Sequence, residues 1–185
     1  AYHATKRRAV ITAGGNSYGY DANGNLTSRN GSTISYTSYN LPGVINAGSA
    51  SSSLWYGAYR NRYKQVAVAG GVTETTIYVA GLLEKVTTSG VIEYRHLIGG
   101  QGGTVAIHTR RSSGSPASST SYVLRDHLGS AETITDGGGA VLAKLSFAAY
   151  GERRDAADWD GPVSAGALAT LGALLPEWLL GRRGS

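Results

Sequence analysis

Apolar and polar residues alternate along short stretches of this 185-residue chain, and glycine-containing turns separate the stretches. One apolar face is formed in this way by Val141, Ala143, Leu145 and Phe147. Lys144 and Ser146 fall on the opposite face. Residues 72–79 read V-T-E-T-T-I-Y-V, a β-branched run of strand length. A period of two is that of a β-strand with one solvated face, so the pattern predicts an all-β protein.

The turns between these stretches are of the hairpin type. Asn23-Gly24 and Asn30-Gly31 are dipeptides preferred in two-residue hairpins, in which both central residues need a positive φ. Further turns are expected at Gly70-Gly71, Ala80-Gly81, Ser89-Gly90, Gly99 to Gly103, Gly129-Ser130 and Gly137 to Gly139. We therefore expect stacked antiparallel β-hairpins in which each hairpin contacts its neighbours.

Tyrosines suggest the length of one repeat. Tyr20, Tyr39, Tyr59 and Tyr78 are separated by 19, 20 and 19 residues. The first three follow a second aromatic residue two or three positions upstream, at Tyr18, Tyr36 and Tyr56. One repeat of about 20 residues is then one hairpin. The residues expected to pack the sheet are Tyr18, Tyr20, Tyr39, Tyr59, Leu26 and Phe147.

The end of the chain has a different pattern. Leu168, Leu171, Leu174 and Leu175 fall at helical spacing within an uncharged run over residues 161–176. That run is shorter than the roughly 20 residues of a membrane-spanning helix. We therefore assign residues 1–160 to one β-domain and residues 161–185 to an Ala/Leu-rich tail, short and helical or irregular, with no membrane span.

Composition excludes several kinds of chemistry. The chain has no cysteine, so it has no disulfides, zinc–thiolate sites or cysteine nucleophiles. Asp126, His127 and Ser130 are the residue types of a hydrolytic triad. Neighbours in a strand point to opposite faces, however, so Asp126 is poorly placed to orient His127. We expect Asp126 and Ser130 to bond turn amides near Gly129 instead, and we predict no enzyme activity.

Ligand-binding motifs are also weak. The four histidines lack metal-ligand spacing, and the glycines at 99–103 lack the lysine of a phosphate-binding loop. Asp21, Asn23 and Asn25 fit a turn better than a calcium site. We expect no cofactor and no metal.

Charge raises one rival interpretation. The net charge is +5, and residues 1–100 hold nine Lys/Arg against four Asp/Glu. Aromatic and basic residues interleave over residues 56–64, as in proteins that bind single-stranded nucleic acid. The basic residues are mostly scattered, which favours a solvated surface and no nucleic-acid partner.

Two segments resemble a known family. Residues 18–26 are similar to the YD repeat of RHS and teneurin-like proteins, through Tyr18, Tyr20, Asp21, Gly24, Asn25 and Leu26. Residues 122–153 resemble the RHS repeat-associated core, through Asp126, His127, Gly129, Ser130, Asp136, Gly137, Tyr150 and Gly151. The resemblance covers about residues 14–160.

The resemblance implies a structural role. In that family the repeats build a hollow shell from a spiralling β-sheet, which encloses a toxic C-terminal cargo. We therefore expect a shell segment of a bacterial RHS-type polymorphic toxin, secreted or at the cell surface, whose partners are further shell repeats and a toxin cargo. The alternative is a cell-surface adhesion or carbohydrate-binding repeat module.

One part of the family pattern is missing. The family's self-cleavage site, with its glycine-rich strands and Asp-Pro pair, is not found after Arg153. Self-cleavage is therefore not attributed to this chain. Either truncation or a change of reading frame near Leu171 would explain the missing part, and in both cases we expect a fragment without activity of its own.

Overall fold

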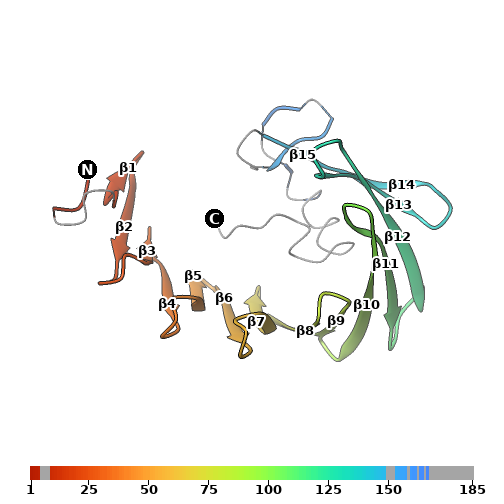
Figure 1. The fold of residues 1–185 in the computed structure, drawn as a ribbon, viewed down its shortest axis with the longest axis horizontal. Helices are drawn as coiled ribbons and strands as arrows, with labels where there is room; N and C mark the ends of the chain where they lie inside the picture. The colour runs from red at the N-terminus through yellow and green to blue at the C-terminus, as the bar shows by residue number, and fades with distance from the viewer. Residues whose placement is uncertain (5–8, 149–152, 158, 162, 165, 167–185) are drawn as a thin grey trace. The chain divides into compact units, whose positions relative to one another are not determined.

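The computed structural model describes residues 1–4, 9–148, 153–157, 159–161, 163, 164 and 166. These residues form sixteen strands: β1 (Thr12–Ala13), β2 (Asn16–Tyr20), β3 (Leu26–Arg29), β4 (Ser32–Tyr36), β5 (Pro42–Ala47), β6 (Ala50–Tyr56), β7 (Arg62–Ala69), β8 (Val72–Val79), β9 (Leu83–Thr88), β10 (Val91–Gly100), β11 (Gly103–Arg111), β12 (Ser118–Arg125), β13 (Ala131–Asp136), β14 (Val141–Lys144), β15 (Ser146–Phe147) and β16 (Arg153–Arg154). Strands β1 to β14, labelled in Figure 1, are hydrogen-bonded in chain order. Strand β15 pairs with β16. The predicted all-β fold of stacked antiparallel hairpins is confirmed.

The chain divides into two compact units, Ala1–Glu93 and Tyr94–Ser185. We call them unit 1 and unit 2. The boundary that the sequence indicates near residue 160 stays a prediction. Most of the Ala/Leu-rich tail, including its expected helix, lies outside the described residues.

Unit 1 uses two kinds of hairpin turn. Asn30 and Gly31 have φ of 47° and 83° between the paired residues Arg29 and Ser32, so the predicted two-residue turn is confirmed. The prediction for Asn23-Gly24 is wrong in type. Only Gly24 has a positive φ there, and the connection is a longer turn between Tyr20 and Leu26, with a register shift in β2.

Few described residues of unit 1 are fully buried, and most of them are polar. Gln65, Thr76 and Glu84 are buried together with one aliphatic residue, Val86. Gln65 pairs with Thr76, and Thr76 pairs with Val86, so three of these side chains share one face of β7–β9. Unit 1 therefore lacks an apolar cluster of the usual kind among its described residues.

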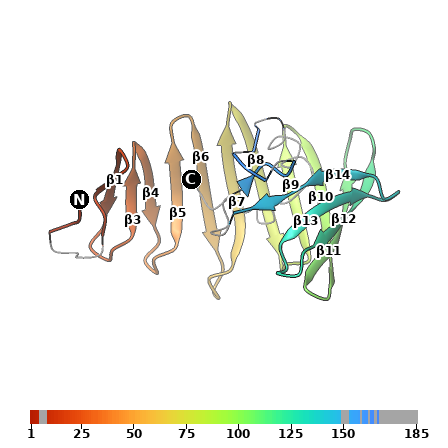
Figure 2. The same ribbon diagram turned by 90° about the horizontal axis from the view of Figure 1, so that it is seen from above.

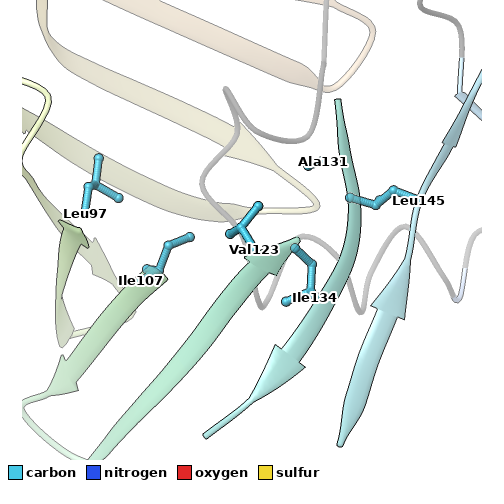
Figure 3. Packing of buried hydrophobic residues seen from close by; sticks show 6 residues of the cluster. All are labelled: Leu97, Ile107, Val123, Ala131, Ile134 and Leu145. Carbon is cyan, nitrogen blue, oxygen red and sulfur yellow. The ribbon is translucent and has the colours of Figure 1, made fainter. Parts of the chain in front are cut away.

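Unit 2 has an apolar cluster. Strands β10 to β13 contribute Leu97, Ile107, Val123, Ala131 and Ile134, and Leu145 between β14 and β15 completes the cluster, as Figure 3 shows. Phe147 packs against this cluster, as the sequence suggests. The continuous strand expected through residues 141–147 is wrong, because the ladder breaks at Leu145, whose N–H donates to the carbonyl of Glu132 at 2.7 Å. A register shift in the β13–β14 pair leaves Val141 55% exposed.

Candidate functional site: the stacked turns

Five connections between strands in the described part of the chain share one backbone pattern. The N–H of the first residue donates to the carbonyl of the fifth, and the N–H of the fourth donates to the carbonyl of the first, at 2.8 to 3.2 Å. The five connections are Asp21–Asn25, Thr37–Leu41, Gly57–Asn61, Asp126–Ser130 and Asp136–Ala140. The fourth residue has a positive φ in every case: Gly24, Asn40, Arg60, Gly129 and Gly139. This is a hairpin turn followed by a left-handed residue, which glycine adopts at least cost.

The side chain of the first residue stabilises this turn where it is an acceptor. Asp21 Oδ1 accepts from the N–H of Asn25 at 2.9 Å. Thr37 Oγ1 accepts from the N–H of Leu41 at 3.1 Å. Asp21 and Thr37 are therefore turn-capping residues in this chain.

Asp126 has the same role in the predicted core motif. Its Oδ1 accepts from the N–H groups of Leu128 and Ser130, both at 2.9 Å. The Ser130 amide holds the pKa of Asp126 below its usual value, and the Leu128 amide and the nearby His127 act in the same direction. The Asp126 carboxylate thus accepts hydrogen bonds from the amides of its own turn, as expected from the sequence.

Sequence reasoning missed the residue that anchors this turn. Arg125 Nη1 donates to the carbonyl of Gly129 at 2.6 Å, and its Nη2 donates to the carbonyl of Thr104 in β11 at 3.3 Å. The guanidinium therefore links the turn to the neighbouring strand β11. No local signal marks Arg125, because its second partner is 21 residues away in the chain. Tyr150 and Gly151 of the same predicted motif lie outside the described residues.

The first two five-residue turns of unit 1 are joined by an amide network. Asn40 Oδ1 accepts from Asn23 Nδ2 at 3.0 Å and from Asn25 Nδ2 at 2.9 Å. Asn25 Nδ2 also donates to Asp21 Oδ2 at 2.9 Å. The Asp21–Asn25 turn is therefore bonded to the next turn along the same edge of the sheet.

The following turn continues the stack through aromatic contacts. The rings of Tyr39 and Tyr56 meet edge to face, with centroids 6.2 Å apart. The Arg60 guanidinium lies 5.6 Å from the centroid of Tyr39. Such contacts add modest stability when they are exposed to solvent.

A row of tyrosine hydroxyls joins the strands beneath these turns. Each hydroxyl donates to the carbonyl of an earlier residue: Tyr20 to Val10 at 2.9 Å, Tyr36 to Leu26 at 2.8 Å, and Tyr56 to Pro42 at 2.9 Å. Each of these tyrosines directly precedes a five-residue turn. The equivalent positions of the repeat are therefore Tyr20, Tyr36 and Tyr56.

This assignment changes the role of two predicted repeat residues. Tyr39 and Tyr59 are the third residues of their turns and lie in no strand. Tyr59 is 90% exposed, so the expectation that it packs the sheet is wrong. Tyr18 lies in β2 opposite Arg29, whose guanidinium is 6.0 Å from its ring centroid. The sequence signal that identifies the equivalent positions of the repeat is a tyrosine that directly precedes a five-residue turn.

The environments of Tyr36 and Tyr56 favour the neutral phenol. Burial raises the pKa of Tyr36, and the negative charge of Asp21 raises it further. Burial also raises the pKa of Tyr56, while Arg62 lowers it in part. Each phenol keeps its proton and so remains a hydrogen-bond donor at physiological pH.

Two features are absent from the described part of the chain, a cluster of metal-ligand side chains and a membrane-spanning helix. They contain no group of three or more His, Cys, Asp or Glu side chains that could hold a metal ion. His96 and His108 lie near each other, with ring centroids 6.3 Å apart, and the second bonds Thr120. Within the same part of the chain, no helix has the length and hydropathy needed to cross a bilayer.

Comparison with known proteins gives likeness in structure alone. No protein-family model and no curated protein matches the sequence. Solved structures do match. The crystal structure of TcdB2-TccC3-Cdc42 superposes with a TM-score of 0.63 at 16% identity, over 72% of this chain and 7% of that one. The Tc holotoxin pore of Photorhabdus luminescens, with a TccC3 variant, gives 0.58 at 14% identity, over 75% and 10%.

The chain shares its fold with Tc toxin chains. A third structure, TcdB2-TccC3-TEV, agrees, with a TM-score of 0.62 at 16% identity over 72% of this chain. This likeness supports the RHS-like shell fold expected from the sequence. The chain spans a tenth or less of the length of the chains it matches.

Proposed function

We propose that this chain forms part of the wall of an RHS-type toxin shell and has a structural role. Its strands would add hairpins to a larger sheet, and that sheet would enclose a C-terminal toxin cargo. The partners would be further shell repeats and the cargo, at the cell surface or outside the cell. In this proposal the chain acts by enclosure and catalyses no reaction.

One observation carries the proposal. Strands pair in chain order through hairpins that repeat the same turn, and this arrangement superposes on chains of Tc toxins. Each repeat contacts only its neighbours, so the architecture extends by adding hairpins at either end. The terminal strands of the sheet, β1 and β14, offer ladder positions for such an extension. Because the chain spans a tenth or less of its structural matches, enclosing a cargo requires more strands.

The test begins with the gene. The DNA on both sides of these 185 codons is translated in all frames, and the longest chain that contains them is expressed. We expect flanking YD-type hairpins and, by electron microscopy, hollow particles whose interior segment resists added protease. Flanking sequence without hairpin repeats, or particles without a protected interior, would contradict a shell role.

A further inference from the structure

The hairpin turns of unit 1 lie at two edges, because antiparallel strands reverse direction at each turn. The turns that connect β4 to β5, β6 to β7 and β8 to β9 lie at one edge. The turns that follow β5, β7 and β9 lie at the opposite edge. Figure 2 shows strands β4 to β9 side by side. We call the first edge the tyrosine edge, after Tyr39 and Tyr59, and the second the glycine edge.

The side chains at the turns differ between the two edges. Each turn of the glycine edge consists of two small residues, Gly48-Ser49, Gly70-Gly71 and Ser89-Gly90. The strands of this sheet therefore reverse without any apolar side chain. The turns of the tyrosine edge, in contrast, carry Tyr39, Tyr59 and Leu82. Turn formation alone does not explain these larger residues.

Two neighbouring turns of the tyrosine edge expose apolar side chains. Tyr59 is 90% exposed in the turn after β6, and Leu82 is 66% exposed in the turn after β8. The two turns are two strands apart, which is about 9.5 Å. Tyr63 at the start of β7 and Val79 at the end of β8 are each 46% exposed beside them. Single exposed apolar residues are common, but several neighbours at one edge indicate an interaction surface.

Positive charge lies among these apolar residues. Arg60 is exposed in the same turn as Tyr59, and Arg62 begins β7. Residues 54–83, all described, contain a single carboxylate, Glu74, which lies toward the glycine edge of β8. The next carboxylate in the chain, Glu84, is buried. We call the exposed and basic residues of these two turns and their flanks the turn patch: Tyr59, Arg60, Arg62, Tyr63, Val79 and Leu82.

We propose that the turn patch binds the surface of a membrane that contains anionic lipids, without crossing it. A tyrosine has an apolar ring and a polar hydroxyl, so it favours the boundary between hydrocarbon and water. Leu82 and Val79 would enter the headgroup region. Arg60 and Arg62 would bind lipid phosphates, which a guanidinium recognises through paired hydrogen bonds. The turn patch belongs to unit 1 alone and needs no cargo, so it is independent of the shell proposal.

The arrangement of the turn patch favours a lipid surface over an acidic protein partner. Interfaces between proteins usually have a desolvated apolar centre and a separate polar rim. In the turn patch, the most exposed apolar residue, Tyr59, is directly followed by Arg60 in one turn. The turns are also the outermost part of the hairpins, so they reach a flat surface before the strands do. Apolar and basic groups that meet the surface together suit lipid headgroups.

The test measures flotation of the full chain with lipid vesicles. One set of vesicles contains phosphatidylcholine alone, and the other contains phosphatidylcholine mixed with phosphatidylserine. We expect binding to the mixed vesicles only, weakened by high salt. The variants Y59S/L82S and R60Q/R62Q should each weaken that binding by about tenfold or more. Circular dichroism of each variant shows whether the fold is retained.

Matched controls separate the turn patch from general stickiness and charge attraction. Leu128→Ser changes a leucine that is 78% exposed in a turn of unit 2, and Lys144→Gln removes a positive charge at an exposed position of β14. Both should leave vesicle binding unchanged. Equal losses from these controls and the patch variants, or no binding to mixed vesicles, would overturn the proposal.

Two further measurements identify another occupant of the turn patch. Analytical ultracentrifugation without lipid tests whether the chain associates with itself. Self-association that Y59S/L82S abolishes, together with absent vesicle binding, would replace the membrane with a second copy of this chain. Titration with polyglutamate tests an acidic polypeptide. Binding to polyglutamate that is tighter than binding to mixed vesicles, and that R60Q/R62Q abolishes, would replace the membrane with an acidic protein.

Discussion

The two units of this chain stabilise similar hairpins by different means. Unit 2 buries an apolar cluster around Ile107 and Ile134, while the buried residues described in unit 1 are mainly polar. In unit 1, neighbouring strands and turns are joined instead by tyrosine hydroxyls and asparagine amides. A hydrogen bond contributes roughly a third as much as a buried aliphatic side chain or less. Removing a buried apolar side chain of unit 2 should therefore lower the free energy of unfolding by a large amount. Removing one polar contact of unit 1 should lower it by a small amount, and the effect should stay local.

The largest expected effect is at Ile134, which is fully buried at the centre of the unit 2 cluster. Ile134→Ala removes buried methyl groups and leaves a cavity, so we expect a loss of about 2–5 kcal/mol in the free energy of unfolding. Urea denaturation measures it. The control Leu124→Ala, at a position 51% exposed in β12, should change stability by less than about 0.5 kcal/mol. Equal effects of the two substitutions would contradict the apolar-core description.

A smaller loss is expected when unit 1 loses one hydroxyl. Tyr36→Phe removes the donor to the carbonyl of Leu26 and should cost about 0.5–1.5 kcal/mol. Tyr59→Phe, at a position 90% exposed, is the matched control and should have almost no effect. In the spectrophotometric titration of wild-type protein, Tyr36 should ionise above its ordinary pKa, and Tyr36→Phe should remove that late component. If Tyr59→Phe lowered the free energy of unfolding more than Tyr36→Phe, the equivalent positions of the repeat would be the evenly spaced tyrosines, Tyr39 and Tyr59.

The positions of the equivalent tyrosines show which structural features a sequence can predict. The turn Asn30-Gly31 is predictable because its two residues alone decide its φ angles. The strand pattern is predictable for the same local reason. The repeat itself is not of constant length, because β3 and β4 have 4 and 5 residues while β5 and β6 have 6 and 7. The interval between equivalent tyrosines therefore grows from Tyr20–Tyr36 to Tyr36–Tyr56, and a search for even spacing selects Tyr39 and Tyr59.

Contacts between segments that are far apart in the chain could not be predicted from the sequence. The bond from Arg125 to Thr104 depends on which strands pair and in what register. A shift of one residue in one pair would move every following side chain to the other face. Asp126, in contrast, caps a turn formed by its own neighbours, so the local sequence was enough to place it.

A gain in stability is expected at one turn of unit 1. Arg60 has φ of 63° at the position where Gly24, Gly129 and Gly139 occur in other turns. A left-handed conformation costs a non-glycine residue about 1–2 kcal/mol. The contact of Arg60 with Tyr39 returns about 0.5–1 kcal/mol. Arg60→Gly should therefore stabilise the chain by up to about 1 kcal/mol, measured as a higher urea midpoint.

The control for Arg60→Gly is a substitution of the opposite kind, at the same position of another turn. Gly24→Ala introduces a side chain at φ of 89° with no contact to offset the strain, so it should destabilise the chain by about 1–2 kcal/mol, more than Arg60→Gly gains. A loss of stability in Arg60→Gly would mean that the stacking of Arg60 on Tyr39 outweighs backbone strain. Polar side-chain contacts in unit 1 would then be stronger than the comparison with unit 2 assumes.

The smallest expected effect is the dependence of unit 2 on Asp126 at acidic pH. Turn amides lower the pKa of this carboxyl in the folded chain, so folding favours its ionised form. The stabilisation is therefore complete above the ordinary carboxyl pKa and is lost as pH falls through the lowered value. A ¹³C NMR titration of the carboxyl carbon measures the shift directly. Asp126→Asn keeps an acceptor oxygen and should remove only the acid-dependent part of stability, whereas a normal or raised pKa for Asp126 would show that its carboxylate does not cap the turn in solution.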